Sequence, residues 1–288
     1  MFDAARGHAE KVLKTGKAAL IVNAAAAGAG DASEVERLLS LGARVDAREQ
    51  GFTPLLASAD SGHTDVCELL LRKGRANIED ITPDGSTALN IAAGEGFVST
   101  VELLLSEGAN VSTKDNEGFT PLLIAAKNGH AKVCELLLGT DKADVKETGP
   151  HGYTPLLAAA SNGHTEVCEL LIEKGKTNIE ETWLGRGCTA LIQAALRGHA
   201  KTVALLLSKG ARPDARDQGF TPLLIAAQRG HTDVCELLLQ RGRANIEDTT
   251  PDGSTALNMA AGEGFERTVE LLQSQCVSEG GFFEVGFL

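Results

Sequence analysis

The sequence predicts an all-α fold in which short helix pairs stack along the chain as a solenoid. One phrase recurs at intervals of 32 to 35 residues, and each copy contains two short apolar patterns with helical spacing. Each pattern is shorter than the ~12–15 residues that an isolated helix needs to be even marginally stable in water. The helices must therefore gain their order from packing on neighbouring copies.

Threonine-led phrases mark the repeats and divide the chain. A partial N-terminal repeat is predicted over residues 1–17, a repeat array over 18–275, and a non-repeat C-terminal tail over 276–288. The array contains about eight repeats, which start near residues 18, 53, 87, 120, 154, 189, 221 and 255.

The first helix of a repeat is predicted from its capping residues. In the repeat that starts near residue 53, Thr53 can cap free amides and Pro54 suits the first helical position. Leu55 and Ala59, four residues apart, form a short apolar face. Gly62 can end the helix in a left-handed conformation.

The second helix follows directly. Asp65 falls in its first turn, where negative charge is favourable. Val66, Cys67, Leu70 and Leu71 recur at helical spacing and predict a buried stripe. A polar stretch with a glycine follows each second helix and predicts a turn that projects from the stack.

The phrases TPLLIAAKNGHAKVCELLL (120–138) and TALIQAALRGHAKTVALLLSKGA (189–211) resemble ankyrin repeats, and the resemblance covers 18–275. It implies a solenoid of helix-turn-helix units with projecting β-hairpin fingers, and a concave groove lined by fingers and first helices. It also implies a non-enzymatic scaffold that binds a partner protein or peptide in that groove. One departure is that Leu56 and Asn90 stand where the family places a histidine that bonds to the threonine. We therefore expect fewer hydrogen bonds at each opening turn.

Composition restricts the partners. The net charge of −12 gives no global basic surface for nucleic acid, so we expect neither nucleic-acid binding nor attraction to anionic membranes. The uncharged run Ala18–Gly30 could be read as a secretory signal, but Asp3, Glu10 and Asn23 do not fit one, and the repeat requires a helix there. We expect no membrane insertion and a monomeric protein.

The cysteines indicate a reducing compartment. Six are present without a CxxC pair, and four of them occupy the same place in the phrase Val-Cys-Glu-Leu-Leu. Repetition of this kind predicts small buried residues rather than zinc ligands or disulfides. The protein is expected in the cytoplasm, with the nucleus as an open alternative.

No motif for catalysis is present. The chain lacks a Walker loop, a dinucleotide glycine motif, HExxH and an EF-hand loop. Six of the seven histidines follow a glycine at the start of a second helix, so their recurrence is a property of the repeat. We expect no enzyme activity, no metal site and no cofactor.

Two parts of the array are near copies. Residues 51–106 and 219–274 agree at 45 of 56 positions, and Asp60-Ser61 becomes Gln228-Arg229. Duplication of a five-repeat block followed by change on one surface explains this pattern. Neutral drift on exposed positions explains it equally well.

Candidate partner contacts include one extended finger. Trp183 and Arg186 lie in the longest repeat, which places an aromatic ring and a guanidinium on a predicted exposed loop. The alternative is that Trp183 folds back on a neighbouring finger, and both interpretations stay open.

A second candidate set is aromatic and occupies the position before the opening threonine. In the ankyrin pattern this position faces the groove, and the rings would form an apolar ladder for a peptide or helix. Packing between fingers is the alternative. The four residues are Phe52, Phe119, Tyr153 and Phe220.

A third set is basic. Lys127, Arg197 and Arg229 fall in the middle of the inferred groove. Acidic Asp60 and Glu95 lie toward one end of it, and Glu263 lies at the other. This distribution favours a partner with an acidic segment despite the negative net charge.

Two questions remain open from the sequence. The chain could be the substrate-targeting or regulatory segment of a larger multidomain enzyme or signalling protein. The tail 276–288 could cover the last repeat, or the chain could be a fragment of a longer array, which is the interpretation we favour.

Overall fold

The computed structural model describes residues 27, 29–140, 142–149, 152–183 and 187–278. The predicted partial repeat 1–17 and residues 279–288 of the tail lie outside them. The described residues form helices, which confirms the all-α prediction, and they contain no regular strand. The helices are α3 (Ala32–Ser40), α4 (Pro54–Asp60), α5 (Thr64–Arg72), α6 (Ala88–Glu95), α7 (Val98–Ser106), α8 (Pro121–Asn128), α9 (Ala131–Leu138), α10 (Pro155–Ser161), α11 (Thr165–Glu173), α12 (Ala190–Arg197), α13 (Ala200–Ser208), α14 (Pro222–Gln228), α15 (Thr232–Gln240), α16 (Ala256–Gly262) and α17 (Glu266–Ser278).

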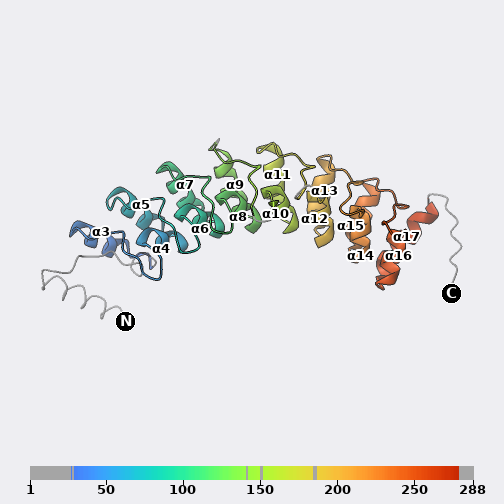
Figure 1. The fold of residues 1–288 in the computed structure, drawn as a ribbon, viewed down its shortest axis with the longest axis horizontal. Coiled ribbons are helices and arrows are strands. Elements are labelled where there is room, and N and C mark those ends of the chain that lie inside the picture. Colours follow the sequence, from blue (N-terminus) through green and yellow to red (C-terminus); the bar gives the residue numbers. More distant parts are fainter. Residues whose placement is uncertain (1–26, 28, 141, 150–151, 184–186, 279–288) are drawn as a thin grey trace. The chain divides into compact units, whose positions relative to one another are not determined.

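The chain divides into two compact bodies. The N-terminal body contains Met1–Ala125 and Lys132–Ala143, and the C-terminal body contains Ala126–Ala131 and Asp144–Leu288. In the N-terminal body α4 packs on α6, and α5 packs on both α3 and α7. In the C-terminal body α10, α12, α14 and α16 form one row, and α11, α13, α15 and α17 form the other (Figure 1).

Each first helix begins as the sequence predicts. Thr53 has extended backbone dihedrals and its Oγ1 accepts a hydrogen bond from Leu56 N at 3.4 Å, while Pro54 occupies the first turn. Leu55 and Ala59 are fully buried. Six other threonine-led helices carry the same side-chain cap, so the opening threonine is confirmed as a start signal.

The second helices bury a narrow stripe. Val66, Cys67 and Leu70 have no exposed surface, whereas Leu71 is only half-buried, so the predicted stripe is one residue too wide. The described cysteines are all free, and five of the six are buried, which confirms their structural role. Burial raises the pKa of the Cys67 thiol to about 11 and that of Cys134 to about 12.

Consecutive repeats are joined by a ring placed over a glycine. The imidazole of His199 lies against Gly163, where an added Cβ would be 2.6 Å from Nδ1. Its Nε2 is 3.0 Å from the carbonyl oxygen of Ser161 in the preceding repeat. His164 and His231 repeat both contacts. These histidines therefore hold neighbouring repeats together, and this structural role explains why they recur with the repeat.

A second link joins the second helices. The hydroxyl of Thr165 in α11 is 2.8 Å from that of Thr202 in α13, and Thr202 is fully buried. Thr64 with Thr100, and Thr232 with Thr268, make the same contact. A buried hydroxyl needs such a partner, because leaving it unsatisfied costs about 1–3 kcal/mol.

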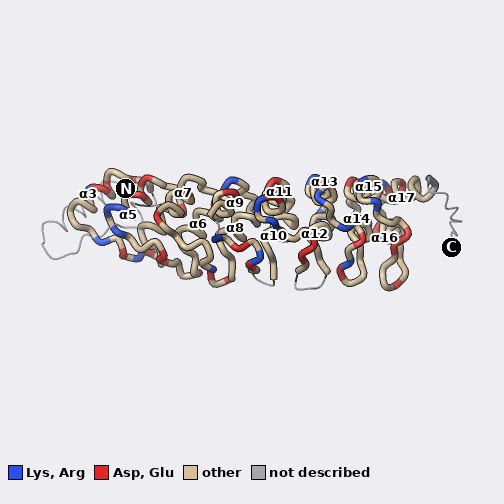
Figure 2. The backbone as a smooth tube through the Cα atoms, turned by 90° about the horizontal axis from the view of Figure 1, so that it is seen from above, with Lys and Arg blue, Asp and Glu red and all other residues tan. Residues whose placement is uncertain are grey.

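The fingers close through isolated antiparallel bridges rather than full strands. The shortest ones pair Glu49 with Phe52 and Asp217 with Phe220. The turn residues Gln218 and Gly219 have φ of 51° and 90°, which a two-residue type I′ hairpin requires. Figure 2 shows acidic and basic residues distributed along the fingers of the C-terminal body.

The expectation of sparse hydrogen bonds at every opening turn is wrong for two repeats. Asn90 accepts from Thr87 N at 3.2 Å and from Thr87 Oγ1 at 2.6 Å, which completes a capping box. Its Nδ2 also donates to the carbonyl oxygens of Thr113 and Phe119 in the next finger, both at 3.2 Å. Asn258 forms the same capping box. An amide in place of the histidine therefore restores the network.

Candidate partner-binding surface

The aromatic residues before the opening threonines close the fingers through their main chains. Phe52 N donates to Glu49 O at 3.0 Å, and Phe220 N donates to Asp217 O at 2.9 Å. Phe119 N donates to the carboxylate of Asp115 at 2.8 Å. The side chains of all four aromatic residues are half-buried. Each ring therefore packs against its finger and still presents an edge to solvent.

Trp183 lies beside Tyr153 of the preceding finger. Their ring centroids are 5.0 Å apart with an interplanar angle of 68°, which is an edge-to-face contact. Trp183 also packs with Phe220 against a buried cluster of Cys188, Ile192 and Ile225. The loop position predicted as exposed is thus half-buried, and the rings of three fingers gather in the C-terminal body. We call Tyr153, Trp183 and Phe220 the aromatic cluster.

The basic residues lie at the ends of first helices in the same body. Lys127 is in the last turn of α8, Arg197 is the last residue of α12, and Arg229 caps α14. All three are exposed. Within the described part of the chain, the guanidinium groups of Arg197 and Arg229 have no hydrogen-bond or ion-pair partner. They are charges available to an external acidic group.

The other charged residues singled out by the sequence are divided between the two compact bodies, except for Arg186. Arg186 lies outside the described residues, so its position relative to the aromatic cluster is untested. Asp60 and Glu95 are exposed in the N-terminal body, and Glu263 is exposed in the C-terminal body. Asp60 stands at the place that Gln228 occupies in the second copy, so the two copies present different charge at equivalent sites.

The acidic pairs at the finger bases have structural roles that sequence reasoning missed. Glu79 accepts a hydrogen bond from Asn110 N of the next repeat at 2.8 Å, and Glu180 accepts one from Arg212 N at 2.9 Å. The carboxylate of Glu181 accepts from the hydroxyl of Thr154, and burial raises its pKa. Glu79 and Glu180 each lie about one repeat before the amide that they bind. This regular spacing was the sequence signal that could have predicted the contacts.

Cys188, beside the aromatic cluster, is a buried thiol. Burial is the main cause that raises the pKa of the Cys188 thiol to about 12, and its sulfur accepts from Gln193 Nε2 at 3.0 Å. A thiol with this pKa is a poor nucleophile at neutral pH. Among the described residues, no group of three or more His, Cys, Asp or Glu side chains could hold a metal ion.

None of the described helices is both long and apolar enough to cross a membrane.

A family model described as "Ankyrin repeats (3 copies)" matches residues 4–82, 75–149, 141–217 and 213–279. The chain belongs to the ankyrin-repeat family. It is also similar to a solved structure of the human ASB11 ankyrin repeat domain, with a TM-score of 0.68 and 28% identity. That likeness covers 77% of this chain and 98% of the ASB11 chain. The ankyrin-repeat solenoid predicted from the sequence is therefore confirmed.

Curated relatives share only part of their length with this ankyrin-repeat chain. A transient receptor potential cation channel subfamily A member 1 homolog from Caenorhabditis elegans is 36% identical over 118 residues, which are 41% of this chain and 10% of the relative. An ankyrin repeat, SAM and basic leucine zipper domain-containing protein 1 from Ornithorhynchus anatinus is 35% identical over 116 residues, 38% of this chain and 24% of the relative. The ankyrin-repeat fold generally mediates protein–protein interaction and is typically non-enzymatic.

Proposed function

We propose that the chain is a non-enzymatic scaffold that binds a partner protein or peptide through the groove expected between fingers and first helices. The supporting observation is the aromatic cluster in the C-terminal body, together with the exposed arginines at the ends of first helices of the same body. Half-buried aromatic rings combined with arginine are the residues that most often dominate the energetics of an interface.

The partner segment is proposed to be acidic. Arg197 and Arg229 occupy the same position in consecutive repeats, and both lack an internal partner within the described residues. A guanidinium binds a carboxylate through two parallel hydrogen bonds, which favours Asp or Glu over other acceptors. Lys127 extends the same charge to an earlier repeat, and Arg186 lies in the finger that carries Trp183.

Phe52 and Phe119 are proposed as separate partner contacts in the N-terminal body. In this body the first helices α4 and α6 end on exposed acidic residues, Asp60 and Glu95. We expect this body to contribute apolar contacts and to disfavour acidic segments.

Peptide display tests the proposal and does not require that the partner be identified first. Peptides selected on the immobilised chain are expected to combine Asp or Glu with aromatic or aliphatic residues. The variant Arg197→Glu/Arg229→Glu should lose these peptides, and Trp183→Ala should weaken them. The matched control is Lys201→Glu/Arg241→Glu, which changes the net charge equally at second helices. Selected peptides that lack acidic residues, or that bind the charge-reversed variant equally, would contradict the acidic specificity.

A second candidate role is the targeting or regulatory segment of a larger enzyme or signalling protein. The observation in its favour is that the relatives above are several times longer than the shared region. A full-length transcript with a catalytic or signalling domain would support this role.

Cytoplasmic location and a monomeric state are proposed with the scaffold function. Five buried free thiols suit a reducing compartment. Light scattering checks the monomer, and microscopy of the tagged chain distinguishes cytoplasm from nucleus.

A further inference from the structure

The first helices of the C-terminal body separate two rows of side chains. The row at their N-terminal ends contains the aromatic cluster, because Tyr153 and Phe220 directly precede the opening threonines of α10 and α14, and Trp183 packs with Phe220. The row at their C-terminal ends contains Arg197 and Arg229. Helix α12 contains 8 residues, so the two rows lie about 12 Å apart.

The surface between the two rows is apolar. Trp183, Phe220 and Leu196 all pack against one buried cluster, which includes Ile225. Leu196 is half-buried and directly precedes Arg197. An apolar strip therefore leads from the aromatic rings, across the first helices, to an exposed positive charge.

The row of helix ends has a defined order of charge. The same position of four consecutive first helices holds Asn162, Arg197, Arg229 and Glu263. The three charged residues of this row are exposed. Counted from α12 to α16, the complementary order of charges on a partner is negative, negative and positive.

The spacing of these charges selects the conformation of the partner segment. Helix α14 packs on both α12 and α16, and the axes of packed helices lie about 8–10 Å apart. In an α-helix, residues i and i+7 share one face and lie about 10.5 Å apart along the axis. In an extended segment, side chains on one face recur at about 7 Å and 13 Å. A helix therefore matches the spacing of the row, and a strand does not.

The width of the strip also fits a helix. An α-helix with its side chains is about 10–12 Å across, which equals the distance between the two rows. A helix that lies across α12, α14 and α16 therefore covers the strip from the aromatic rings to the arginines.

We propose that the partner contributes an α-helix to this surface, with acidic residues at i and i+7 facing Arg197 and Arg229. A basic residue at i+14 faces Glu263, and an apolar face of the helix packs on the aromatic cluster. This inference rests on the proposed partner-binding function and specifies the partner. The three matched positions require about 15 residues, or about 21 Å of helix.

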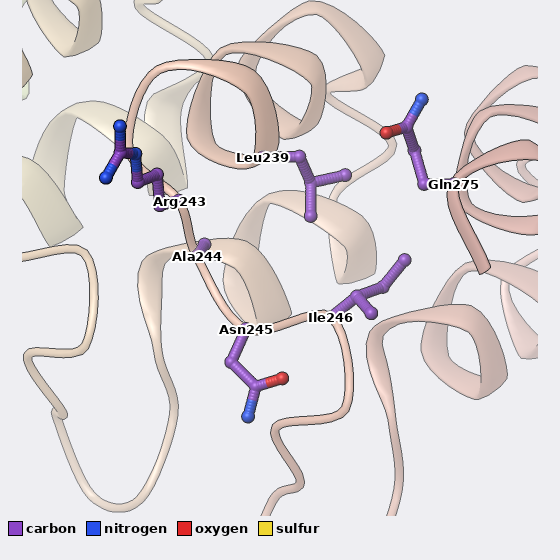
Figure 3. A pocket seen from close by; sticks show the side chains of 6 residues that line it. All are labelled: Leu239, Arg243, Ala244, Asn245, Ile246 and Gln275. Atoms are coloured by element: carbon purple, nitrogen blue, oxygen red, sulfur yellow. The ribbon is translucent and has the colours of Figure 1, made fainter. Parts of the chain in front are cut away.

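A cavity of about 360 Å³ in the same body lies outside this surface. It is lined by Leu239 of α15, Gln275 of α17 and Arg243 in the loop between second helix and finger (Figure 3). Arg243 is exposed. It therefore supplies a matched control, which is an arginine of the same body that is not at the end of a first helix.

Charge exchange between the full chain and a synthetic peptide tests the register. The peptide has about 15 residues, the proposed charges, leucines on the adjoining face and alanine elsewhere. It is made in both chain directions, and the tighter of the two is used. Arg229→Glu should lower its affinity by roughly fivefold, and a lysine at i+7 should restore the affinity. Arg197→Glu should be rescued only by a lysine at i, and Glu263→Lys only by an acidic residue at i+14.

The control is measured at physiological salt, where exposed charges more than about 8 Å apart are largely screened. Under this condition Arg243→Glu should leave the affinity of the peptide unchanged. Loss of affinity in Arg243→Glu equal to that in Arg229→Glu would overturn the assignment of the acidic residues to the first-helix ends.

A side-chain cross-link on the outward face of the peptide tests the conformation. An isolated helix of this length is only marginally stable in water. Holding it as a helix should therefore raise the affinity by up to about tenfold. A peptide of the same composition with its acidic residues at i and i+4 should bind more weakly, and so should one with a central proline.

The outcomes separate this inference from the proposed function. Equal binding with the acidic residues at i and i+4, or weaker binding after cross-linking, would overturn the helical partner and leave an acidic partner in place. Rescue of Arg197→Glu and Arg229→Glu by the same exchanged peptide would overturn the register. Failure of every acidic peptide to bind would overturn the proposed function and this inference together.

Discussion

Replacing Gly163 with alanine tests whether the ring over glycine joins neighbouring repeats. Gly163 has φ of +75°, and an added Cβ would lie 2.6 Å from Nδ1 of His199. Ordinary contact begins near 3.4 Å, so the imidazole must move by almost 1 Å. That movement breaks the 3.0 Å contact between Nε2 and Ser161 O.

The expected loss in the free energy of unfolding has two contributions, one from the backbone of residue 163 and one from its contact with His199. A left-handed backbone conformation costs a residue with a Cβ about 1–2 kcal/mol. Overpacking adds roughly 1–3 kcal/mol, and the lost hydrogen bond adds about 1 kcal/mol. We therefore expect Gly163→Ala to lower the free energy of unfolding by about 3–6 kcal/mol.

The chain supplies the matched control. Gly210 has φ of +91°, and nothing lies within 4 Å of a Cβ added there, so Gly210→Ala isolates the backbone part. Urea denaturation, followed by circular dichroism, compares the two variants. Combining Gly163→Ala with His199→Ala should recover about 1–2 kcal/mol relative to the sum of the single changes. Equal destabilisation by the two alanines, within ~0.5 kcal/mol, would refute the joining role of the ring.

Three further outcomes are expected. Asn90→Leu removes the capping box and both bonds to the next finger; Thr113 O loses its side-chain donor, whereas Phe119 O keeps the hydrogen bond from Asp115 N. The free energy of unfolding should therefore fall by about 2–3 kcal/mol in urea titrations; a change under ~0.5 kcal/mol would contradict the bridging role. Thr202→Val keeps the shape and removes the bond to Thr165, and should cost about 1 kcal/mol by the same measurement; no loss would show that the threonine contact is neutral. Burial raises the pKa of Cys134 to about 12. The folded chain therefore holds this thiol protonated while the unfolded chain ionises it, so its contribution is complete below about pH 8.5 and is lost as the pH rises toward about 12. Thiol titration with a chromogenic disulfide at pH 8 should show Cys134 reacting only after denaturant is added, and rapid reaction in native buffer would contradict its burial.

The parts of the fold that depend on one repeat could be predicted from the sequence. Thr53 and Pro54 start a helix through local capping, and Val66 and Cys67 identify a buried face by spacing alone. These signals act within one or two helical turns, so they can be read without reference to the neighbouring repeat.

Contacts between repeats were harder to predict. Asn90 was expected to weaken its turn, but its amide reaches the next finger 29 residues later, at Phe119. The carboxylate of Glu181 accepts a hydrogen bond from Thr154, which opens the same repeat 27 residues earlier. Both depend on how far one finger stands from the next, which sequence spacing does not encode.

In the candidate site, too, the sequence predicted which residues to consider but not how residues of different fingers contact one another. The repeated aromatic position predicted Tyr153 and Phe220 as candidate contacts, and the basic residues in the middle of the inferred groove predicted Arg197 and Arg229. The edge-to-face contact of Trp183 with Tyr153 could not be predicted, because the orientation of the longest finger decides it.

The glycine–ring contact also bears on how the chain could have lengthened. His63 and His231 are equivalent residues of the two copies, and each ring lies on a glycine of the repeat before it, Gly30 or Gly198. A histidine ring therefore packs on a glycine at both junctions. A block inserted between whole repeats places its first histidine on a glycine of the repeat before it, so the contact can form there as well. Gene duplication in this architecture yields a foldable product at once. Selection can then act on the surface of the new copy, because the contacts between repeats need no further substitutions.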